Sequence, residues 1–427
     1  MDKKVYQNFI NILKEELVPA TGCTEPISVA YAAALARDTL GATPEKVEIS
    51  VSGNILKNVK SVVVPNTGGL KGVASAAAAG IIAGNAKGEL QVISLVTEDD
   101  LENIRKYIKT AKISVASSNT GCIFDIAVKC VKDNEYALVR IAGHHTNVVH
   151  IERNGEIILD KRVVTAEAAL TDRSSLSVER IVEFANEVRL CDVESTICRQ
   201  MEYNGKIAEE GLKNDYGARV GKVLLKSFGN DVHNRAKATA AAGSDARMNG
   251  CCLPVIIVSG SGNQGMTASL PVMVYGEHLK VSKEKLIRAL VVSDLITIHL
   301  KSGIGRLSAY CGAVSAGCGA AAGVCYLYGG GYPEISKTLV NAIAIDSGVI
   351  CDGAKSSCAA KIASAVEAGL VGLEMTRNGS EFCCGDGILG DCVECTIDNV
   401  GELASIGMRD TDEEIIRLMI KPDKSET

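Results

Sequence analysis

The first forty residues show apolar side chains at helical spacing. Residues 5–17 place one apolar stripe on a single helix face: Val5, Phe9, Ile12, Leu13 and Leu17. The segment 18–22 then breaks the pattern, because it holds a proline and a glycine. A second helix is predicted to follow, with Thr24 as its N-cap and Gly41 at its end. Cys23 would therefore lie at the mouth of this second helix.

Between residues 45 and 165 the apolar period changes to two. The run KVEISV at 46–51 alternates apolar and polar side chains, which is typical of a half-buried strand. Asn154–Gly155 separates two such runs and predicts a tight β-hairpin. Helical patterns interrupt the strands at roughly 71–86 and 98–109. The pattern predicts an α/β region built on a mixed sheet.

Beyond the polar stretch TDRSSLS at 171–177, the pattern is helical almost throughout. The predicted helices, many of them rich in Ala and Gly, cover 177–190, 192–213, 217–228, 233–242, 282–300, 304–328, 333–346 and 355–369. The fold class is therefore α+β, with an N-terminal mixed α/β sheet domain and a larger all-α C-terminal domain. We expect N-terminal helices at 1–44 that pack on the helical domain, a sheet domain at 45–175, and a helical catalytic domain at 176–427.

Charge and composition narrow the class of partner. The formal net charge of −6 leaves no basic stripe for phosphates, so we expect a small-molecule partner and no nucleic acid. The opening MDKKVYQNFINILKEEL lacks the apolar core of a signal peptide, which predicts a cytoplasmic protein. Residues 307–333 carry no charge, but Gly, Ala, Ser and Cys dominate them, which favours a buried helix over a membrane span. The sequence leaves a homodimer open.

Sixteen cysteines are the most unusual feature of the composition. Disulfides are disfavoured in a reducing cytosol, so the surplus indicates metal ligation, thiol chemistry or small buried apolar side chains. Cys23 is placed at a helix N-terminus, where the helix dipole and the free N–H groups lower the pKa of a thiol. The sequence therefore predicts a reactive thiolate at this position.

Three other cysteines follow a long gap and then a short one. Cys311 lies in a predicted long buried helix, Cys351 follows the helix 333–346, and Cys358 lies where a new helix starts. Three thiolates can hold three irons of a four-iron cluster and leave the fourth iron free for a substrate. Sixteen cysteines offer many such triples, so spacing alone does not select this one.

A second group of cysteines lies downstream in FCCGDGILGDCVEC. It holds Cys383, Cys384, Cys392 and Cys395, of which the last two form a C-x-x-C motif. Four clustered thiols suit a tetrahedral zinc site or a second cluster. The alternative is a Gly-rich surface loop whose thiols bind no metal, and the sequence leaves both open.

Four segments resemble one family: GCTEPISVAYAAA at 22–34, AGSDARMNG at 242–250, SGSGNQGMTASLPV at 259–272 and GRLSAYCGAVSAGCGAAAG at 305–323. They are similar to the L-cysteine desulfidase group of the iron–sulfur serine dehydratase alpha-chain family, which is UPF0597-like, over about residues 15–420. The resemblance implies a 4Fe–4S cluster on Cys311, Cys351 and Cys358. It also implies that Cys23 is the catalytic residue that accepts a proton, with a buried inert cysteine or a fourth cluster ligand as the alternatives.

The activity that the resemblance implies is β-elimination on a small amino acid, with L-cysteine giving pyruvate, ammonia and sulfide. No lysine context suits pyridoxal phosphate, so iron would take its place. An L-serine dehydratase is one alternative, and a non-catalytic iron–sulfur or zinc sensor is another. The chain departs from the family pattern in its last residues, MIKPDKSET, because the serine dehydratases carry a cysteine there that can cap the open iron.

The SGSGNQG segment predicts the site of the substrate carboxylate. Its backbone N–H groups, together with Ser261, Asn263 and Gln264, can surround a carboxylate, although a structural Gly turn would also explain the pattern. Asn119, in the segment SSNTG, is predicted to line the same cleft.

Other polar residues are less informative. Arg247 and Lys301 suit either a substrate carboxylate or buried salt bridges. His144 and His145 in the sheet domain are interpreted as structural hydrogen-bonding residues and have no part in the predicted chemistry.

Overall fold

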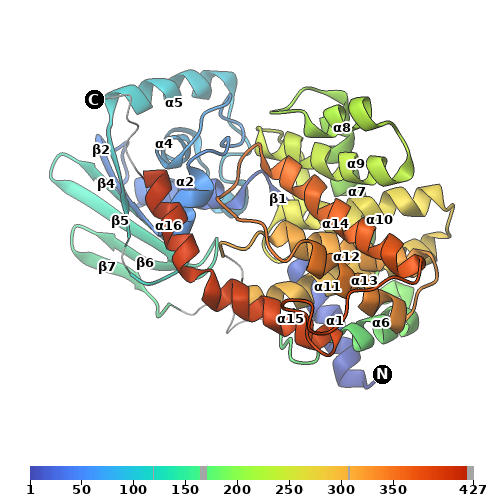
Figure 1. Ribbon diagram of the computed structural model, residues 1–427. Helices are drawn as coiled ribbons and strands as arrows, with labels where there is room; N and C mark the ends of the chain where they lie inside the picture. Colours follow the sequence, from blue (N-terminus) through green and yellow to red (C-terminus); the bar gives the residue numbers. More distant parts are fainter. Residues whose placement is uncertain (119, 164–170, 306–307, 421–427) are drawn as a thin grey trace.

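The computed structural model describes residues 1–118, 120–163, 171–305 and 308–420. Two large hydrophobic cores lie side by side (Figure 1). One core gathers the sheet with the helices that cover it, and the other is almost entirely helical. The predicted α+β fold class is thereby confirmed.

The sheet region holds six strands in the order β3-β2-β4-β5-β6-β7. Only β2 and β3 are parallel, and the chain between them forms the helical crossover that a parallel pair requires. The elements are β2 (Lys46–Val51), α3 (Gly53–Val59), α4 (Val73–Ala83), the 3₁₀ helix η1 (Ala86–Gln91), α5 (Glu98–Thr110), β3 (Lys112–Ser117), β4 (Asp125–Lys132), β5 (Glu135–Ala142), β6 (Val148–Arg153) and β7 (Glu156–Asp160). The predicted hairpin is confirmed, since Asn154 and Gly155 both have positive φ between β6 and β7.

The first two helices pack in different cores. Helix α1 (Lys3–Glu16) joins the helical core, as expected. Helix α2 (Thr24–Leu40) instead joins the sheet core, so the expectation that both helices pack on the helical domain was wrong for α2. The physical reason is close packing with α4, where a Cβ added at Gly80 would lie 2.1 Å from the carbonyl oxygen of Ala30.

The helical part surrounds α11, α12 and α14. Its elements are α6 (Val178–Glu187), α7 (Leu190–Lys213), α8 (Val220–Phe228), α9 (Val232–Met248), α10 (Gly262–His278), α11 (Lys283–Ile304), α12 (Gly312–Leu327), α13 (Tyr332–Ile345) and α14 (Cys358–Arg377). A small antiparallel pair, β1 (Pro19–Thr21) with β8 (Pro254–Ile256), lies at the boundary with the sheet region. Residues 18–22 therefore connect the two parts rather than forming a simple turn.

The predicted helix 304–328 is shorter at its start than expected. Helix α11 ends at Gly305, which has a φ of 85°, and α12 begins only at Gly312. Cys311 is the N-cap of α12 and does not lie inside a helix. Glycine in this backbone region ends a helix readily, and the reversal brings Cys311 to the boundary between the two cores.

The last helices return to the sheet region. Helix α15 (Val393–Glu402) and the π-helical turn η3 (Leu403–Gly407) lead into α16 (Arg409–Ile420), which crosses to α3 (Figure 1). Lys57 of α3 forms a buried ion pair with Asp412 of α16. The end of the chain thus ties the helical part to the sheet region.

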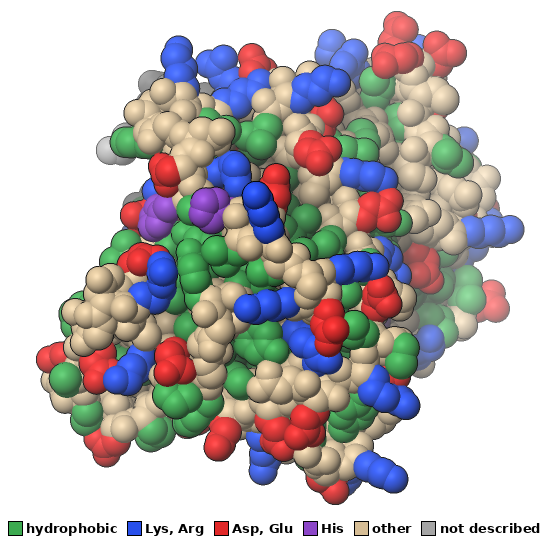
Figure 2. Space-filling view, turned by 90° about the vertical axis from the view of Figure 1, so that its right-hand side faces the viewer, with side chains coloured by type: hydrophobic (Ala, Val, Ile, Leu, Met, Phe, Trp, Pro, Cys, Tyr) green, Lys and Arg blue, Asp and Glu red, His purple; other side chains and the backbone are tan. Residues whose placement is uncertain are grey.

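The face in Figure 2 mixes acidic and basic side chains without a continuous basic stripe. Among the described residues, no helix combines the length and the apolar character needed to cross a membrane.

Candidate active site

A cavity of about 350 Å³ lies where the sheet region meets the helical part. The sheet region contributes Glu25, Lys57 and residues 121–124 and 143–145 to its walls. The helical part contributes the segments that precede α10, α12 and α14. The cavity is lined by the three cysteines that were predicted as ligands and by the predicted proton acceptor: Cys311, Cys351, Cys358 and Cys23.

Four helix N-termini converge on this cavity. Cys23 is the N-cap of α2, Ser261 that of α10 and Cys311 that of α12, while Cys358 is the first residue of α14. None of these four helices has a side-chain cap on its N–H groups. Helix N-termini carry partial positive charge and free N–H donors, so their convergence favours anions in the cavity.

A short backbone bridge holds Cys311 beside Cys351. The N–H of Cys311 donates to the carbonyl of Val349 at 2.9 Å, and the N–H of Cys351 donates to the carbonyl of Ala309 at 2.6 Å. Tyr310 and Ile350 form the isolated antiparallel bridge between them. Two cysteines 40 residues apart in sequence therefore share one wall of the cavity, and the start of α14 brings Cys358 to the same space.

The ionisation of these thiols differs. A hydrogen bond from Cys311 lowers the pKa of Cys351 against the opposing effect of burial, with further help from the charges of Lys57 and Lys301. The same hydrogen bond, together with burial, raises the pKa of Cys311, and burial raises that of Cys358. A thiolate is the form that binds metals, and the positive charges around Cys351 stabilise it.

The charged side chains around the cavity are mainly basic. Lys57, Arg247 and Lys301 line it, whereas Glu25 is the single Asp or Glu among the described lining residues. Lys301 lies on α11 and is only 4% exposed, and this burial lowers its pKa to about 8. The lining therefore suits a ligand with net negative charge.

Cys23 is not the reactive thiolate that its helix position predicted. Burial, followed by the negative charge of Glu25, raises the pKa of Cys23 well above its ordinary value. Its thiol donates a hydrogen bond to Oε2 of Glu25 at 3.0 Å. Desolvation and a neighbouring carboxylate both favour the neutral thiol. Together they outweigh the helix dipole, which favours the thiolate and was the basis of the prediction from sequence.

Glu25 is held as a carboxylate. Nδ2 of Asn58 donates to its Oε1 at 3.1 Å, and the hydroxyl of Thr24 donates to its Oε2 at 3.1 Å. Burial opposes ionisation of Glu25, but the charge of His145 and the hydrogen bond from Cys23 lower its pKa overall. Cys23 and Glu25 therefore form a thiol–carboxylate pair in the cavity wall.

The structure brings most of the predicted substrate-binding residues together. Ser261, Asn263 and Gln264 line the cavity at the N-terminus of α10. The turn before them is strained, because the non-glycine residue Ser259 has a φ of 48°. Asn119 lies outside the described residues.

A family model for the serine dehydratase alpha chain matches residues 87–417. The chain belongs to the serine dehydratase alpha-chain family. A UPF0597 protein from Desulfitobacterium hafniense (strain Y51) is 57% identical over 418 residues, which are 98% of this chain and 97% of that protein. UPF0597 proteins from Lachnoclostridium phytofermentans and Treponema denticola are 50% and 46% identical, over 97% and 99% of this chain and 100% and 99% of those proteins.

Membership confirms the predicted serine dehydratase alpha-chain, UPF0597-like family and supports a lyase of the serine dehydratase type, with a role in amino-acid catabolism. The matched residues include the SGSGNQG segment and the three cavity cysteines of the helical part. Cys23 and Glu25 lie before the matched stretch, although the full-length relatives span them.

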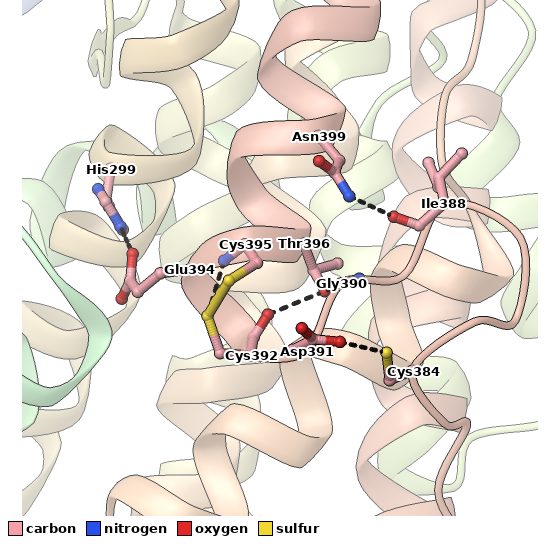
Figure 3. The surroundings of a disulfide bond; sticks show 10 residues. All are labelled: His299, Cys384, Ile388, Gly390, Asp391, Cys392, Glu394, Cys395, Thr396 and Asn399. Atoms are coloured by element: carbon pink, nitrogen blue, oxygen red, sulfur yellow. Dashed lines mark hydrogen bonds and ion pairs between the residues drawn. A yellow bond between two sulfur atoms is a disulfide. The ribbon is translucent and has the colours of Figure 1, made fainter.

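The cysteines of residues 383–395 are exposed and lie outside the cavity. Figure 3 shows Cys384, Cys392 and Cys395. Cys392 and Cys395 are joined by a disulfide at the start of α15. A disulfide was not expected from the sequence, because disulfides are disfavoured in a reducing cytosol. The thiol of Cys384 donates to Asp391. Within the part of the chain that is described, no three His, Cys, Asp or Glu side chains are grouped closely enough to hold a single metal ion.

Several cavity residues had no predicted role, among them Lys57, Asn58 and Cys122. Lys57 and Asn58 lie in a helix of the sheet region whose sequence carries no chemical signal. Cys122 was one of sixteen cysteines without a distinguishing pattern. Glu25 had no predicted role either, although its distance of two positions from Cys23 was an available signal.

Proposed function

We propose that this protein is a cytoplasmic iron–sulfur lyase that catalyses β-elimination on a small amino acid, with L-cysteine giving pyruvate, ammonia and sulfide. One observation carries the proposal: Cys311, Cys351 and Cys358, from three separate segments, line one cavity that Cys23 also reaches. A merely structural use of cysteine would not require this convergence among basic residues and helix N-termini.

Cys311, Cys351 and Cys358 would hold a 4Fe–4S cluster. Three cysteine thiols that line one cavity are a donor set that suits such a cluster. Lys57 and Lys301 would offset the negative charge of the thiolates. When bound, a cluster with one iron free of protein ligands supplies a Lewis acid for the departing sulfur or oxygen.

Cys23 would accept the α-proton of the substrate, with Glu25 as its partner. Because the resting thiol is protonated, its proton must first move, and the Glu25 carboxylate at 3.0 Å is placed to receive it. The thiolate of Cys23 then takes the α-proton while the Cα=Cβ bond forms and the bond to the leaving group breaks. The aminoacrylate that results hydrolyses to pyruvate and ammonia.

The amino-acid substrate would bind at the N-terminus of α10. Ser261, Asn263 and Gln264, with Asn119 from the sheet region, would supply hydrogen bonds to it. Orientation by these groups directs the α-carbon toward Cys23, which is how a bound geometry accelerates proton transfer.

The test is anaerobic reconstitution with iron and sulfide, followed by assays of sulfide and pyruvate from L-cysteine. We expect equal release of both products and the broad visible absorption of an iron–sulfur cluster. Cys311→Ala should lose the absorption and the turnover, whereas Cys318→Ala, a change of a buried cysteine on the same α12 that does not line the cavity, should keep both. A Cys311→Ala protein with full iron content and turnover would refute the proposal.

L-Serine is the second candidate substrate, because the matching family is named for serine dehydratase. The two substrates differ in one atom, and the ratio of their kcat/KM values decides between them. A protein that binds iron but forms pyruvate from neither substrate would be the non-catalytic sensor.

A further inference from the structure

We infer that Arg247, acting with the N-terminus of α10, binds the α-carboxylate of the substrate and makes a free carboxylate obligatory. The inference rests on the proposed lyase function and adds to it a residue that selects the substrate class. Arg247 is one of the last residues of α9, and α10 begins fifteen residues later. Two segments that are close in sequence thus present donors to the same wall of the cavity.

Arg247 is a buried cation without a carboxylate partner. It is 4% exposed, and it forms no ion pair with any described residue. Its Nη1 donates to Oδ1 of Asn263 at 3.1 Å, while its Nε is buried without a hydrogen-bond acceptor. The buried salt bridge that the sequence left open is therefore not formed. The Glu25 carboxylate interacts with this charge without forming an ion pair. A buried guanidinium is costly unless an anion contacts it, which points to an anionic ligand in the cavity.

The α10 N-terminus supplies a second and independent sign of a ligand. Ser261 gives the helix no side-chain cap, and Oε1 of Gln264, a residue only 6% exposed, is also buried without a partner. A Cβ added at Gly262 would lie 2.5 Å from Nε of Arg247. Glycine here lets the guanidinium lie directly against the first turn of the helix, so a carboxylate can contact Arg247 and the free N–H groups together.

The other two cavity cations have different surroundings. Lys57 is paired with Asp412, and Lys301 acts on Cys311 and Cys351. The charge of Arg247 acts instead on Cys23 and Glu25, the proposed proton-transfer pair. A carboxylate on Arg247 would therefore hold the α-carbon on the side of the cavity where Cys23 lies.

This arrangement defines the substrates as small α-amino acids with a free carboxylate. L-Cysteine and L-serine qualify, whereas cysteamine and ethanolamine carry the same leaving groups but leave Arg247 unpaired. A site built to bind a charged group strongly rejects an analogue that lacks it.

The first test compares Arg247→Gln and Arg247→Lys with the wild type in the reconstituted holoenzyme. A hydrogen bond to a charged group is lost in the glutamine variant, so we expect its KM for the better substrate to rise roughly 10- to 100-fold, with a smaller change in kcat. The KM of the lysine variant should lie between those of the wild type and the glutamine variant, because an ammonium lacks the planar fork of a guanidinium.

Arg199→Gln is the matched control, for which we expect an unchanged KM. Arg199 is a half-buried arginine outside the cavity, and it donates a hydrogen bond to the carbonyl of Leu17. A KM within twofold of wild type for Arg247→Gln would overturn the inference.

The second test measures binding without turnover. L-Alanine has the carboxylate but no leaving group, and ethylamine has neither, so the melting temperature of the holoenzyme should rise with millimolar L-alanine only. Arg247→Gln should lose this rise. If wild-type protein turns over no amino acid but shows the Arg247-dependent rise, the proposed reaction fails and the carboxylate site stands. If wild-type protein releases pyruvate and L-alanine gives an equal rise in both proteins, or none in either, the reaction stands and the role of Arg247 fails.

Discussion

The cavity cysteines and the cysteines of residues 383–395 are opposites in sequence and in space. Cys311, Cys351 and Cys358 are spread over a long stretch of chain and line one cavity. The four cysteines of residues 383–395 are neighbours in sequence, yet they lie exposed on a loop and at the start of α15.

The difference between the two groups lies in their electrostatic surroundings. The cavity group faces helix N-termini and the charges of Lys57 and Lys301, which stabilise a thiolate at Cys351. In the exposed group, a hydrogen bond to Asp391 raises the pKa of Cys384 and favours the neutral thiol. Under the proposed function, electrostatic surroundings and not closeness in sequence decide which cysteines bind metal, because positive groups stabilise the thiolate that metals require.

The largest expected effect comes from comparing two variants, each of which replaces one cysteine of one group by serine. Cys351→Ser should abolish the iron–sulfur absorption and all turnover, because it removes the thiolate that the lysines stabilise. Cys384→Ser, the matched change in the exposed group, should leave iron content and turnover at wild-type values. Iron and sulfide analysis of the two anaerobically reconstituted proteins measures this directly. Equal iron loss in both variants would contradict the distinction between the groups.

A smaller effect is expected from Cys23, a cavity cysteine that is not a proposed ligand. Cys23→Ala should keep the cluster absorption but lower kcat about 10²- to 10⁴-fold, the usual contribution of a general base. Glu25→Gln should also keep the cluster and lower kcat, because the amide cannot accept the thiol proton. Visible spectra and initial rates on the same samples separate the two roles. Loss of the absorption in Cys23→Ala would indicate that Cys23 is a cluster ligand and not the general base.

Asp294 is a buried titratable group outside the cavity, so it tests whether burial by itself indicates a catalytic or metal-binding role. It is fully buried on α11, the helix of Lys301, but it does not line the cavity, and burial raises its pKa to about 7. In the unfolded chain, the pKa of this carboxyl is roughly 4. At pH values between the two pKa values, the folded protein keeps a proton that the unfolded chain has lost. The free energy of unfolding therefore falls as the pH rises through that window.

Asp294→Asn removes this titration and keeps the oxygen that accepts a hydrogen bond from Gln200. We expect the variant to be more stable than wild type at pH 8 by roughly 1–3 kcal/mol, with a smaller gain at pH 5.5. Melting curves at the two pH values check the sign, and iron content should not change. A gain that is larger at pH 5.5 would contradict the assigned pKa.

The smallest effect is expected from the disulfide itself. The double change of Cys392 and Cys395 to Ser should leave iron content, kcat and KM unchanged, because neither sulfur lines the cavity. Loss of iron in this double variant would place a metal in the exposed loop and would remove the contrast between the two cysteine groups.

Much of the fold follows from local pattern. The period-two runs at 46–51 and on either side of Asn154–Gly155 became β2, β6 and β7, the hairpin formed, and most predicted helices of the C-terminal part exist. The exceptions depend on neighbours that periodicity does not report. The close contact of Gly80 with Ala30 holds α2 on the sheet region, and Gly305 ends α11 before Cys311.

The sequence by itself determined the family, the α+β class and part of the set of residues that line the cavity. Only the tertiary structure decided how those residues behave, because pKa values and ion pairs depend on burial and on groups distant in sequence. Burial and Glu25 turned the expected Cys23 thiolate into a neutral thiol. The same packing left Arg247 without a carboxylate partner, a property that no local pattern contains.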